Sequence, residues 1–340
     1  MKNIYGITRK ELEVFLEEKG YKKFKAHQIF EWLYQKRVKD FALMTNISKE
    51  LIAILKENFN IDSLEIMDCL KDELACKFLF KLHDNEKIEA VLMRHDYGNS
   101  LCISTQVGCN MGCKFCESGR RKKVRNLETY EMVLQILEAE EYLNLKLTHV
   151  VLMGIGEPFD NYDNVINFVE IINDAKGFAL GSRHITISTS GLIPYIKKFS
   201  DYDKQVNLAI SLHAPNDKLR SELMPVNKAY PLKDLMVTLK EYIVKTNRRV
   251  TFEYIMLDGV NDTKECALEL VNLVRGMNCY INLIPYNETS HIEFKKSSQQ
   301  KIMNFFDILK KNKVNVTIRK EFGSKLNAAC GQLRSKYEEG

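Results

Sequence analysis

Apolar side chains recur at helical spacing in the first part of the chain. A stripe that starts at Leu12 follows Thr8 and Glu11, whose spacing is that of a capping box at the start of a helix. The same periodicity predicts two further helices, one over residues 26–37 and one from residue 48 onward. This end of the chain is therefore expected to be mainly helical.

Two short apolar runs follow, at residues 78–82 and 88–92, and the residues Asp84-Asn85 supply a turn between them. Runs of this length on either side of a turn predict a pair of strands. We expect residues 1–94 to form a small, mainly helical accessory domain, and residues 95–340 to form the larger core.

Beyond residue 101 the pattern changes to strands that alternate with helices. This rhythm is typical of a parallel sheet covered by helices, so the core is predicted to be an α/β domain. The alternation alone does not separate an open sheet from a barrel. The predicted strands cover residues 149–153, 184–188, 207–212, 251–256, 280–284 and 315–319, and the predicted helices cover 129–141, 165–173, 232–245 and 264–275.

Composition changes this picture little. The chain has 340 residues, of which 45% are apolar and 28% are charged, which suits one large catalytic domain with a smaller attachment. We find no uninterrupted apolar run near the length of a membrane span, and the N-terminus lacks the apolar stretch of a secretory signal. We therefore expect a cytoplasmic protein without a membrane partner. The net charge of +5 is only a weak argument for an RNA partner.

Three cysteines in one short run carry the strongest chemical signal. Cys109, Cys113 and Cys116 have the spacing C-x3-C-x2-C, and Gly108 and Gly112 make the run a loop that can fold around one centre. Four-iron clusters normally take four thiolates, so three would leave one iron open to a small molecule. The alternative is a zinc site completed by a distant residue. Zinc pairs usually have a second C-x2-C downstream, and the sequence has none, so a cluster site is favoured.

The cysteine run, followed by Gly154-Ile-Gly-Glu-Pro158, resembles the radical S-adenosylmethionine (SAM) superfamily. Within it, the chain closely resembles the RlmN/Cfr methyltransferases of large-subunit ribosomal RNA. This resemblance implies a partial (β/α)6 TIM-like barrel with its working residues at the C-terminal strand ends. The matching stretches keep the family's order through most of the chain: Cys102–Cys109, Met153–Pro158, Ile187–Gly191, Ser211–Pro215, Leu283–Asn287 and Ala328–Leu333.

The resemblance also implies the cofactors. Cys109, Cys113 and Cys116 would hold a [4Fe–4S] cluster whose fourth iron binds SAM, and an electron donor such as flavodoxin or ferredoxin would reduce it. Taken singly, the other matching positions would more often be ordinary turn or core residues than ligands. The implied SAM-binding residues are Gly156, Glu157, Ser188, Ser211, Leu212, His213 and Asn287.

Three more residues match the family's catalytic groups. Cys330 would carry a methyl group, Cys102 would be the resolving cysteine, and Glu89 would be the acid–base residue. Without the resemblance, Cys330 would be assigned to helix packing and Glu89 to a solvated strand. The implied route uses two SAM molecules per turnover, one to methylate Cys330 and one to yield the radical that activates this methyl group. A Cys102–Cys330 disulfide then frees the product.

Basic residues near the cysteines indicate where RNA would bind. Residues 120–123 read Arg-Arg-Lys-Lys, Arg125 follows, and Lys22, Lys23 and Lys25 form a second cluster. Such runs are often only solvated faces, and a run beside a catalytic loop is the better candidate for phosphate contact. The expected RNA is large-subunit ribosomal RNA, with transfer RNA as a second substrate, and the protein is expected to be a monomer.

Two segments depart from the family pattern, and they leave alternatives open. These are Glu117-Ser-Gly-Arg120 after the last cluster cysteine and Ser324-Lys-Leu-Asn327 ahead of Cys330. Several fragments resemble RlmN-type enzymes, which methylate C2 of adenine. The alternatives are a Cfr-type enzyme, which methylates C8 and confers antibiotic resistance, and a non-catalytic RNA-binding or cluster-sensing relative.

Overall fold

The computed structural model describes residues 1–120, 122–289 and 291–319, and ten strands in this part form one sheet. The strands are β3 (Glu65–Lys71), β4 (Ala75–Lys81), β5 (Lys87–His95), β6 (Gly98–Cys102), β9 (His149–Leu152), β10 (Ile185–Thr189), β11 (Asn207–Ser211), β12 (Val250–Met256), β13 (Cys279–Pro285) and β14 (Val316–Ile318). Their order is β14-β13-β12-β11-β10-β9-β6-β5-β4-β3. Neighbours are parallel from β14 to β6 and antiparallel from β6 to β3.

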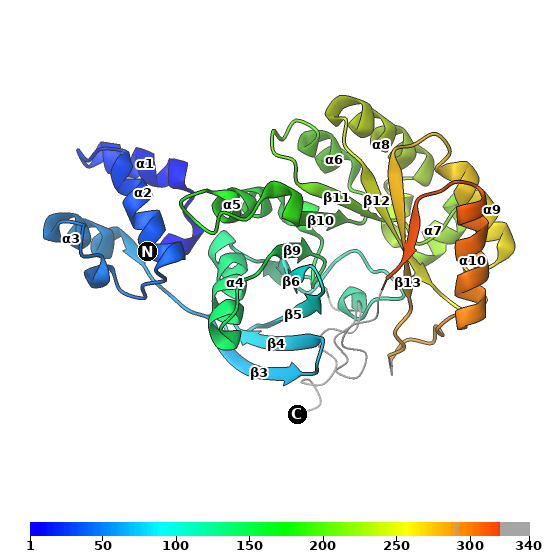
Figure 1. Cartoon of the computed structure of the whole chain (residues 1–340), viewed down its shortest axis with the longest axis horizontal. Coiled ribbons are helices and arrows are strands. Elements are labelled where there is room, and N and C mark those ends of the chain that lie inside the picture. Colours follow the sequence, from blue (N-terminus) through cyan, green and yellow to red (C-terminus); the bar gives the residue numbers. More distant parts are fainter. Residues whose placement is uncertain (121, 290, 320–340) are drawn as a thin grey trace.

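Helices connect the parallel strands (Figure 1). They are α4 (Thr129–Leu143), α5 (Tyr162–Asn173), α6 (Ile193–Phe199), α7 (Asp217–Leu223), α8 (Leu232–Thr246), α9 (Lys264–Leu273) and α10 (Gln299–Lys311). Counted over the described chain, six strand–helix units run from β6 to α10 and precede β14. Arg319, directly after β14, donates to the sulfur of Met93 on β5 at 3.7 Å, so the sheet curls back on itself. The expected partial (β/α)6 barrel is confirmed.

The strands at the antiparallel edge show where sequence patterns were sufficient and where they were not. The predicted pair at 78–82 and 88–92 is confirmed, because β4 and β5 form an antiparallel ladder. Strand β6 was not predicted, since it starts with the weak strand formers Gly98-Asn-Ser. The predicted domain boundary between residues 94 and 95 falls inside β5, whose ladder with β6 continues into the parallel strands.

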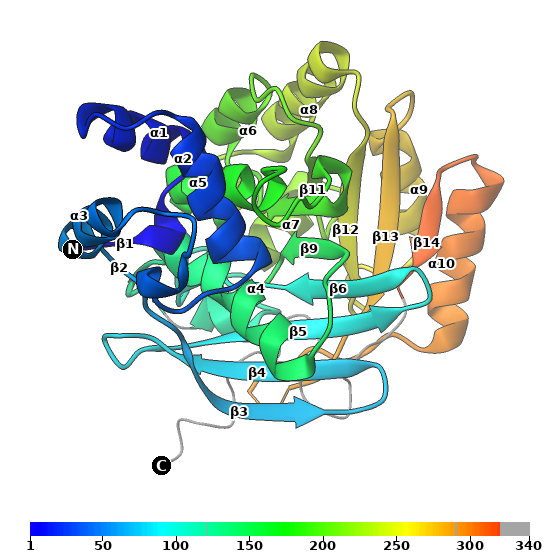
Figure 2. The ribbon, with the colours of Figure 1, turned by 60° about the vertical axis from the view of Figure 1, so that its left-hand side comes forward.

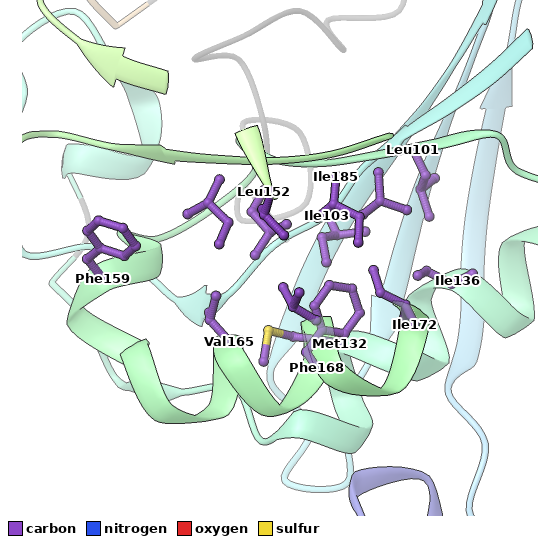
Figure 3. Close-up of a cluster of buried hydrophobic side chains, with 14 of the residues drawn as sticks. Leu101, Ile103, Met132, Ile136, Leu152, Phe159, Val165, Phe168, Ile172 and Ile185 are labelled. Atoms are coloured by element: carbon purple, nitrogen blue, oxygen red, sulfur yellow. The ribbon is translucent and has the colours of Figure 1, made fainter. Parts of the chain in front are cut away.

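The main core lies between the sheet and the helices that cover it. Leu101 on β6 and Leu152 on β9 point toward helices α4 and α5, whose side chains Met132 and Phe168 face them (Figure 3). Residues one position along the strands point the other way, because successive strand side chains alternate between faces. Cys102 therefore lies on the inner face of the barrel, opposite to α4.

The N-terminal helices form as the sequence predicts. In α1 (Arg9–Glu18) the capping box is present, because Thr8 accepts from the Glu11 N–H and the Glu11 carboxylate accepts from the Thr8 N–H. The second predicted helix appears as α2 (Phe24–Phe30), continued by one π-helical turn, and the third as α3 (Lys49–Asn58). In the part of the chain that the structure describes, no helix has both the length and the apolarity to cross a membrane.

These helices pack against the barrel's own helices (Figure 2). The ring of Tyr34 lies 5.3 Å from that of Phe178, and Arg9 donates to Asp174 at 2.7 Å. Arg37 also pairs with Glu140 on α4. A single buried apolar cluster extends from the N-terminal helices through the barrel, so the two parts share one core.

Candidate functional site

A short hairpin holds the cysteine loop. Strands β7 (Gln106–Val107) and β8 (Arg125–Asn126) pair antiparallel, and Cys109 follows β7 after one glycine. Gly108 has a φ of +75°, and a Cβ there would lie 2.3 Å from the carbonyl oxygen of Lys122. Only glycine allows this close approach between the two sides of the hairpin. The loop is therefore fixed at its base by a position that the backbone geometry restricts to glycine.

The three predicted cluster thiols line one cavity inside the barrel mouth. Burial raises the pKa of the Cys109 thiol to about 12, and burial together with the nearby Cys116 and Cys109 raises that of Cys113 well above its usual range. Cys109 is buried and Cys113 and Cys116 are half-buried. Thiols gathered at one cavity repel one another as thiolates, so they need positive charge to ionise, which iron supplies.

This donor set fits a four-iron cluster with three protein ligands. Within the described ranges, no three His, Cys, Asp or Glu side chains form a group that could hold a single metal ion. Cys109, Cys113 and Cys116 all line the cavity.

The glycine loop after β9 is shaped by the strand beside it. A Cβ on Gly154 would lie 2.5 Å from the carbonyl oxygen of Ile103, and one on Gly156, whose φ is +111°, would lie 2.7 Å from the Cβ of Gln106. In the structure these glycines let the loop lie directly against residues 103–106, which lead into the cysteine hairpin.

Glu157 ends this loop with a fixed, buried carboxylate. One of its oxygens accepts from the N–H of Phe159 at 3.0 Å, and the other accepts from the N–H of Ser190 at 2.7 Å. Burial raises the pKa of Glu157, and the donated hydrogen bond from Ser190 opposes that rise. Glu157 and Gly156 both line the cavity of the cysteines, so a carboxylate is available to an ammonium group there.

The other predicted SAM-binding residues divide into two groups. Ser188, Ser211 and His213 line the same cavity, on the strand ends next to the glycine loop. Leu212 is fully buried in the core, and neither it nor Asn287 lines this cavity.

His213 is held in a single orientation. Its φ is +57°, its Nδ1 accepts from the Ile255 N–H at 3.1 Å, and its ring meets that of Phe115 edge-on at 4.7 Å. Burial, with a contribution from Arg220, lowers the pKa of His213 to about 3, so the imidazole is neutral.

Sequence reasoning missed two charged residues beside the predicted site, the buried Glu253 and the half-buried Arg319. Glu253 on β12 and Arg319 line the cavity, and Glu253 accepts from the side-chain amide of Asn282 at 2.9 Å. Burial raises the pKa of Glu253, which Arg319 opposes. A glutamate within the apolar run 250–256 was the available signal.

Arg220 was also missed, because it reads as an ordinary helix residue. Its side chain is fully buried and donates to the carbonyls of Ser190 at 2.6 Å and Ser211 at 3.1 Å. It thereby ties together the ends of β10 and β11, which carry the cavity-lining serines.

The predicted acid–base and resolving residues lie on neighbouring strands of the inner face. Val91 on β5 is paired with Cys102 on β6, which makes Glu89 a diagonal neighbour of Cys102 on the same face. Glu89 is fully buried rather than solvated, and its carboxylate pairs with Lys77 at 2.7 Å. Cys330 lies outside the described residues.

Most of the basic run beside the cysteines is neutralised within the protein. Arg120 pairs with Glu117 at 3.2 Å, and Lys123 pairs with Asp160 at 2.7 Å. Lys122 is exposed, and Arg121 lies outside the described residues.

Arg125 is neutralised as well. It makes two 2.8 Å contacts with Glu131 and one of 2.6 Å with Asp84. Arg125 thereby holds the hairpin to Asp84 and Glu131, and phosphate contact by this basic run stays a prediction.

Comparison with known protein families matches two parts of the chain. Residues 2–61 match the model of the ribosomal RNA large subunit methyltransferase N-terminal domain, and residues 103–272 match the radical SAM superfamily.

Curated relatives match almost the whole chain. The chain is 52% identical to a probable dual-specificity RNA methyltransferase RlmN of Spiroplasma citri, over 99% of both chains. It is also 52% identical to the protein of the same name from Enterococcus faecalis, over 98% of this chain and 96% of the relative. A crystal structure of a radical SAM methyltransferase from Sphaerobacter thermophilus superposes with a TM-score of 0.92 at 40% identity, covering 98% of this chain and 99% of the other.

Proposed function

Since the chain belongs to the RlmN family of radical SAM RNA methyltransferases, we propose that it methylates C2 of an adenosine in 23S ribosomal RNA, and also in transfer RNA. The dual-specificity name of its relatives supports two RNA substrates. The observation that carries the proposal is the inner face of the barrel. Cys102 shares a buried apolar cluster there with Ile155 of the glycine loop, and this loop borders the cavity that the three cluster cysteines line.

Different residues of the cavity would hold the two cofactors. Cys109, Cys113 and Cys116 would hold the [4Fe–4S] cluster, and Glu157 would receive the ammonium group of SAM. When bound, the cluster supplies the electron that cleaves SAM and so makes the S-methyl group of Cys330 reactive toward an aromatic carbon. Because the imidazole of His213 is neutral, its Nδ1 can accept the hydrogen bond from the Ile255 N–H, and this bond holds the cavity wall in place.

Three side chains would complete the transfer. Cys330 carries the methyl carbon as a thioether, and this carbon becomes bonded to the adenine ring after it loses one hydrogen atom. Glu89 accepts the ring proton that the new bond displaces. The hydrogen atom and the one electron that the ring adduct loses with its proton would be taken up by the bound cofactors. The thiolate of Cys102 then forms a disulfide with Cys330 as the carbon–sulfur bond breaks, and the carbon keeps the electron pair and takes up a proton to become the methyl group. Reduction of the disulfide by a cellular thiol returns both cysteines to the starting state.

The same proposal includes the setting of the reaction. A protein that acts on ribosomal and transfer RNA works in the cytoplasm, and reduction of its cluster calls for a small donor such as flavodoxin or ferredoxin. We propose that the enzyme acts as a monomer, because the cluster cysteines, Glu157, Glu89 and Cys102 all come from one chain.

The roles of the two thiols are tested by trapping the covalent intermediate. Cys102→Ala purified from cells should carry a protein–RNA species that survives a denaturing gel and disappears with ribonuclease. Cys330→Ala should carry none and should form no methyladenosine. Cys266→Ala, which removes a buried thiol on α9, is the matched control and should behave as wild type. Normal methylation by Cys102→Ala without a ribonuclease-sensitive species would show that the assigned roles are wrong.

The position of the methyl group needs a separate measurement. Mass mapping of adenosines in ribosomal and transfer RNA, from cells with and without the gene, should show 2-methyladenosine that depends on the gene. Methyl groups at C8 would instead indicate a Cfr-type enzyme, and no change in either RNA would indicate a non-catalytic relative.

A further inference from the structure

A buried lysine lies beside the residue to which we assign proton removal. The side chain of Lys77 on β4 is only 5% exposed, that of Glu89 is 0% exposed, and their charged atoms are 2.7 Å apart. Lysine is rarely buried this deeply unless it is paired. Placing two charges inside a barrel has a large desolvation cost, and such a pair is seldom retained for stability alone. The pair therefore calls for another explanation.

The strand register places this pair next to the resolving thiol. Lys77 is opposite Val91, Val91 is opposite Cys102, and Cys102 is opposite Val151, so these four residues form one row across the inner face. Glu89 stands two residues from Val91, on the same face. Diagonal neighbours in a sheet have Cα atoms about 7–8 Å apart, so the carboxylate and the thiol are close neighbours on this face.

The backbone at Glu89 is fixed independently of its side chain. The hydroxyl of Ser104 donates to the Glu89 carbonyl at 2.6 Å and accepts from the N–H of Ile155 at 3.0 Å. Ser104 is itself fully buried, so it joins β5 to the glycine loop of the SAM site. The backbone of Glu89 is thus set by Ser104, and the ammonium group of Lys77 is the charged partner of its carboxylate.

We propose that Lys77 is a positioning residue that keeps Glu89 ionised and aimed at the ring proton of the covalent protein–RNA intermediate. The inference rests on the function proposed above and goes beyond it, because it adds a residue that acts through the base. An opposite charge at this distance favours the carboxylate form, and only that form can accept a proton. Lys77 itself neither touches the reacting atoms nor takes part in forming the intermediate.

The test separates formation of the intermediate from its release. Reconstituted holoenzyme is mixed with SAM, a reductant and ribosomal RNA from cells that lack the gene, and the protein–RNA species is followed over time on denaturing gels. Lys77→Met should cleave SAM and form this species as wild type does. Release should be slower by roughly tenfold or more, within the roughly 100- to 10,000-fold that a positioned base contributes. Lys77→Arg, which keeps the charge, should restore most of the rate.

Three further variants distinguish a positioning role from a structural one. Lys81→Met removes a less buried lysine from the same strand, one that pairs with Glu65 instead, and should release the product normally. Glu89→Gln should be as slow as Lys77→Met or slower, and the double variant should be no slower than Glu89→Gln alone, because residues that act through one another are not additive. The double variant and Lys77→Arg also avoid a lone buried charge if Lys77→Met does not fold.

The outcomes against the inference are distinct from those against the proposed function. Normal release by Lys77→Met while Glu89→Gln is trapped would overturn only the role of Lys77. A double variant much slower than Glu89→Gln would also overturn it, since Lys77 would then act independently. Normal release by Glu89→Gln, with Cys102→Ala still trapped, would overturn Glu89 as the base.

Discussion

At the scale of single residues, the cavity is lined by ionisable side chains whose charged forms are made costly by burial. His213 avoids this cost by remaining neutral, and its Nδ1 serves as an acceptor for the Ile255 N–H. Glu157 offsets it by accepting two backbone N–H groups. Each of these residues holds a neighbouring backbone segment in addition to facing the cavity. Substitutions there should therefore alter the shape of the site as well as its chemistry.

The neutral histidine predicts how stability depends on pH. Burial lowers the pKa of His213 to about 3 in the folded state, against an ordinary value of 6.5 that applies to the unfolded chain. Below pH 6.5 the unfolded chain binds the extra proton, so this contribution to stability is present above that pH and is lost as pH falls toward 3. Between about pH 7 and about pH 5 the loss should be about 2 kcal/mol.

His213→Asn is the variant that measures this contribution. Asparagine tolerates the positive φ and offers a side-chain oxygen to Ile255, but it does not titrate. Urea unfolding at the two pH values should show a smaller loss of stability in the variant than in wild type. An equal loss in both proteins would mean that His213 is not the group responsible.

At the scale of elements, the hairpin of β7 and β8 is the part on which the cysteine loop depends. Arg125 on β8 joins this hairpin to Glu131 on α4 and to Asp84 in the β4–β5 turn. Glu131 is fully buried, and Arg125 is the cation that contacts both of its carboxylate oxygens. The arginine that looked like an RNA contact is thus a structural brace between three elements.

Replacement of this brace should affect the cluster rather than the RNA. Arg125→Met leaves Glu131 buried without its main cation, which typically costs roughly 3–5 kcal/mol. We expect lower iron content after reconstitution and faster loss of the cluster's absorbance. Lys122→Met removes an exposed charge from the same loop and should keep its iron while its RNA affinity becomes weaker and less salt-dependent. Iron retention equal to wild type in Arg125→Met would contradict the brace.

At the scale of the whole molecule, the N-terminal helices and the barrel are expected to unfold together. One apolar cluster runs through both, and ion pairs such as Arg9–Asp174 and Arg37–Glu140 cross between them. The chain has a single tryptophan, Trp32, which lies in the N-terminal part. Its fluorescence therefore reports on these helices alone, whereas far-ultraviolet circular dichroism reports on the whole fold.

The two signals should show one shared transition in urea, because coincident probes are the mark of a cooperative unit. An independent accessory domain would lose its fluorescence signal at a different urea concentration from the dichroism signal. A variant with Arg37→Met should shift both midpoints together. Separate midpoints in wild type would show that the shared core does not couple the two parts.

The limits of prediction from the sequence follow from the range of the interactions. Helices with capping boxes and strands with clear periodicity depend on neighbours in the chain, so they could be predicted. The cluster cysteines could be found because they are close in sequence. The state of Arg125 could not, because its partners Asp84 and Glu131 come from two other elements. Glu253 was missed for the same reason, since only the curled sheet brings its strand to the cavity.

The antiparallel extension of the sheet has a consequence for catalysis as a cycle. Strands β4 and β5 carry Lys77 and Glu89, and both precede residue 103, where the stretch shared with the radical SAM superfamily begins. An enzyme that captures its substrate covalently needs residues that release the substrate as well as residues that capture it. On the proposed roles, Cys330 captures the RNA, and release depends on Glu89 on β5 and Cys102 on β6. A chain with the capture and without the release would react once and stay bound to its RNA, so these strands make the difference between a catalyst and a reagent consumed by its own reaction.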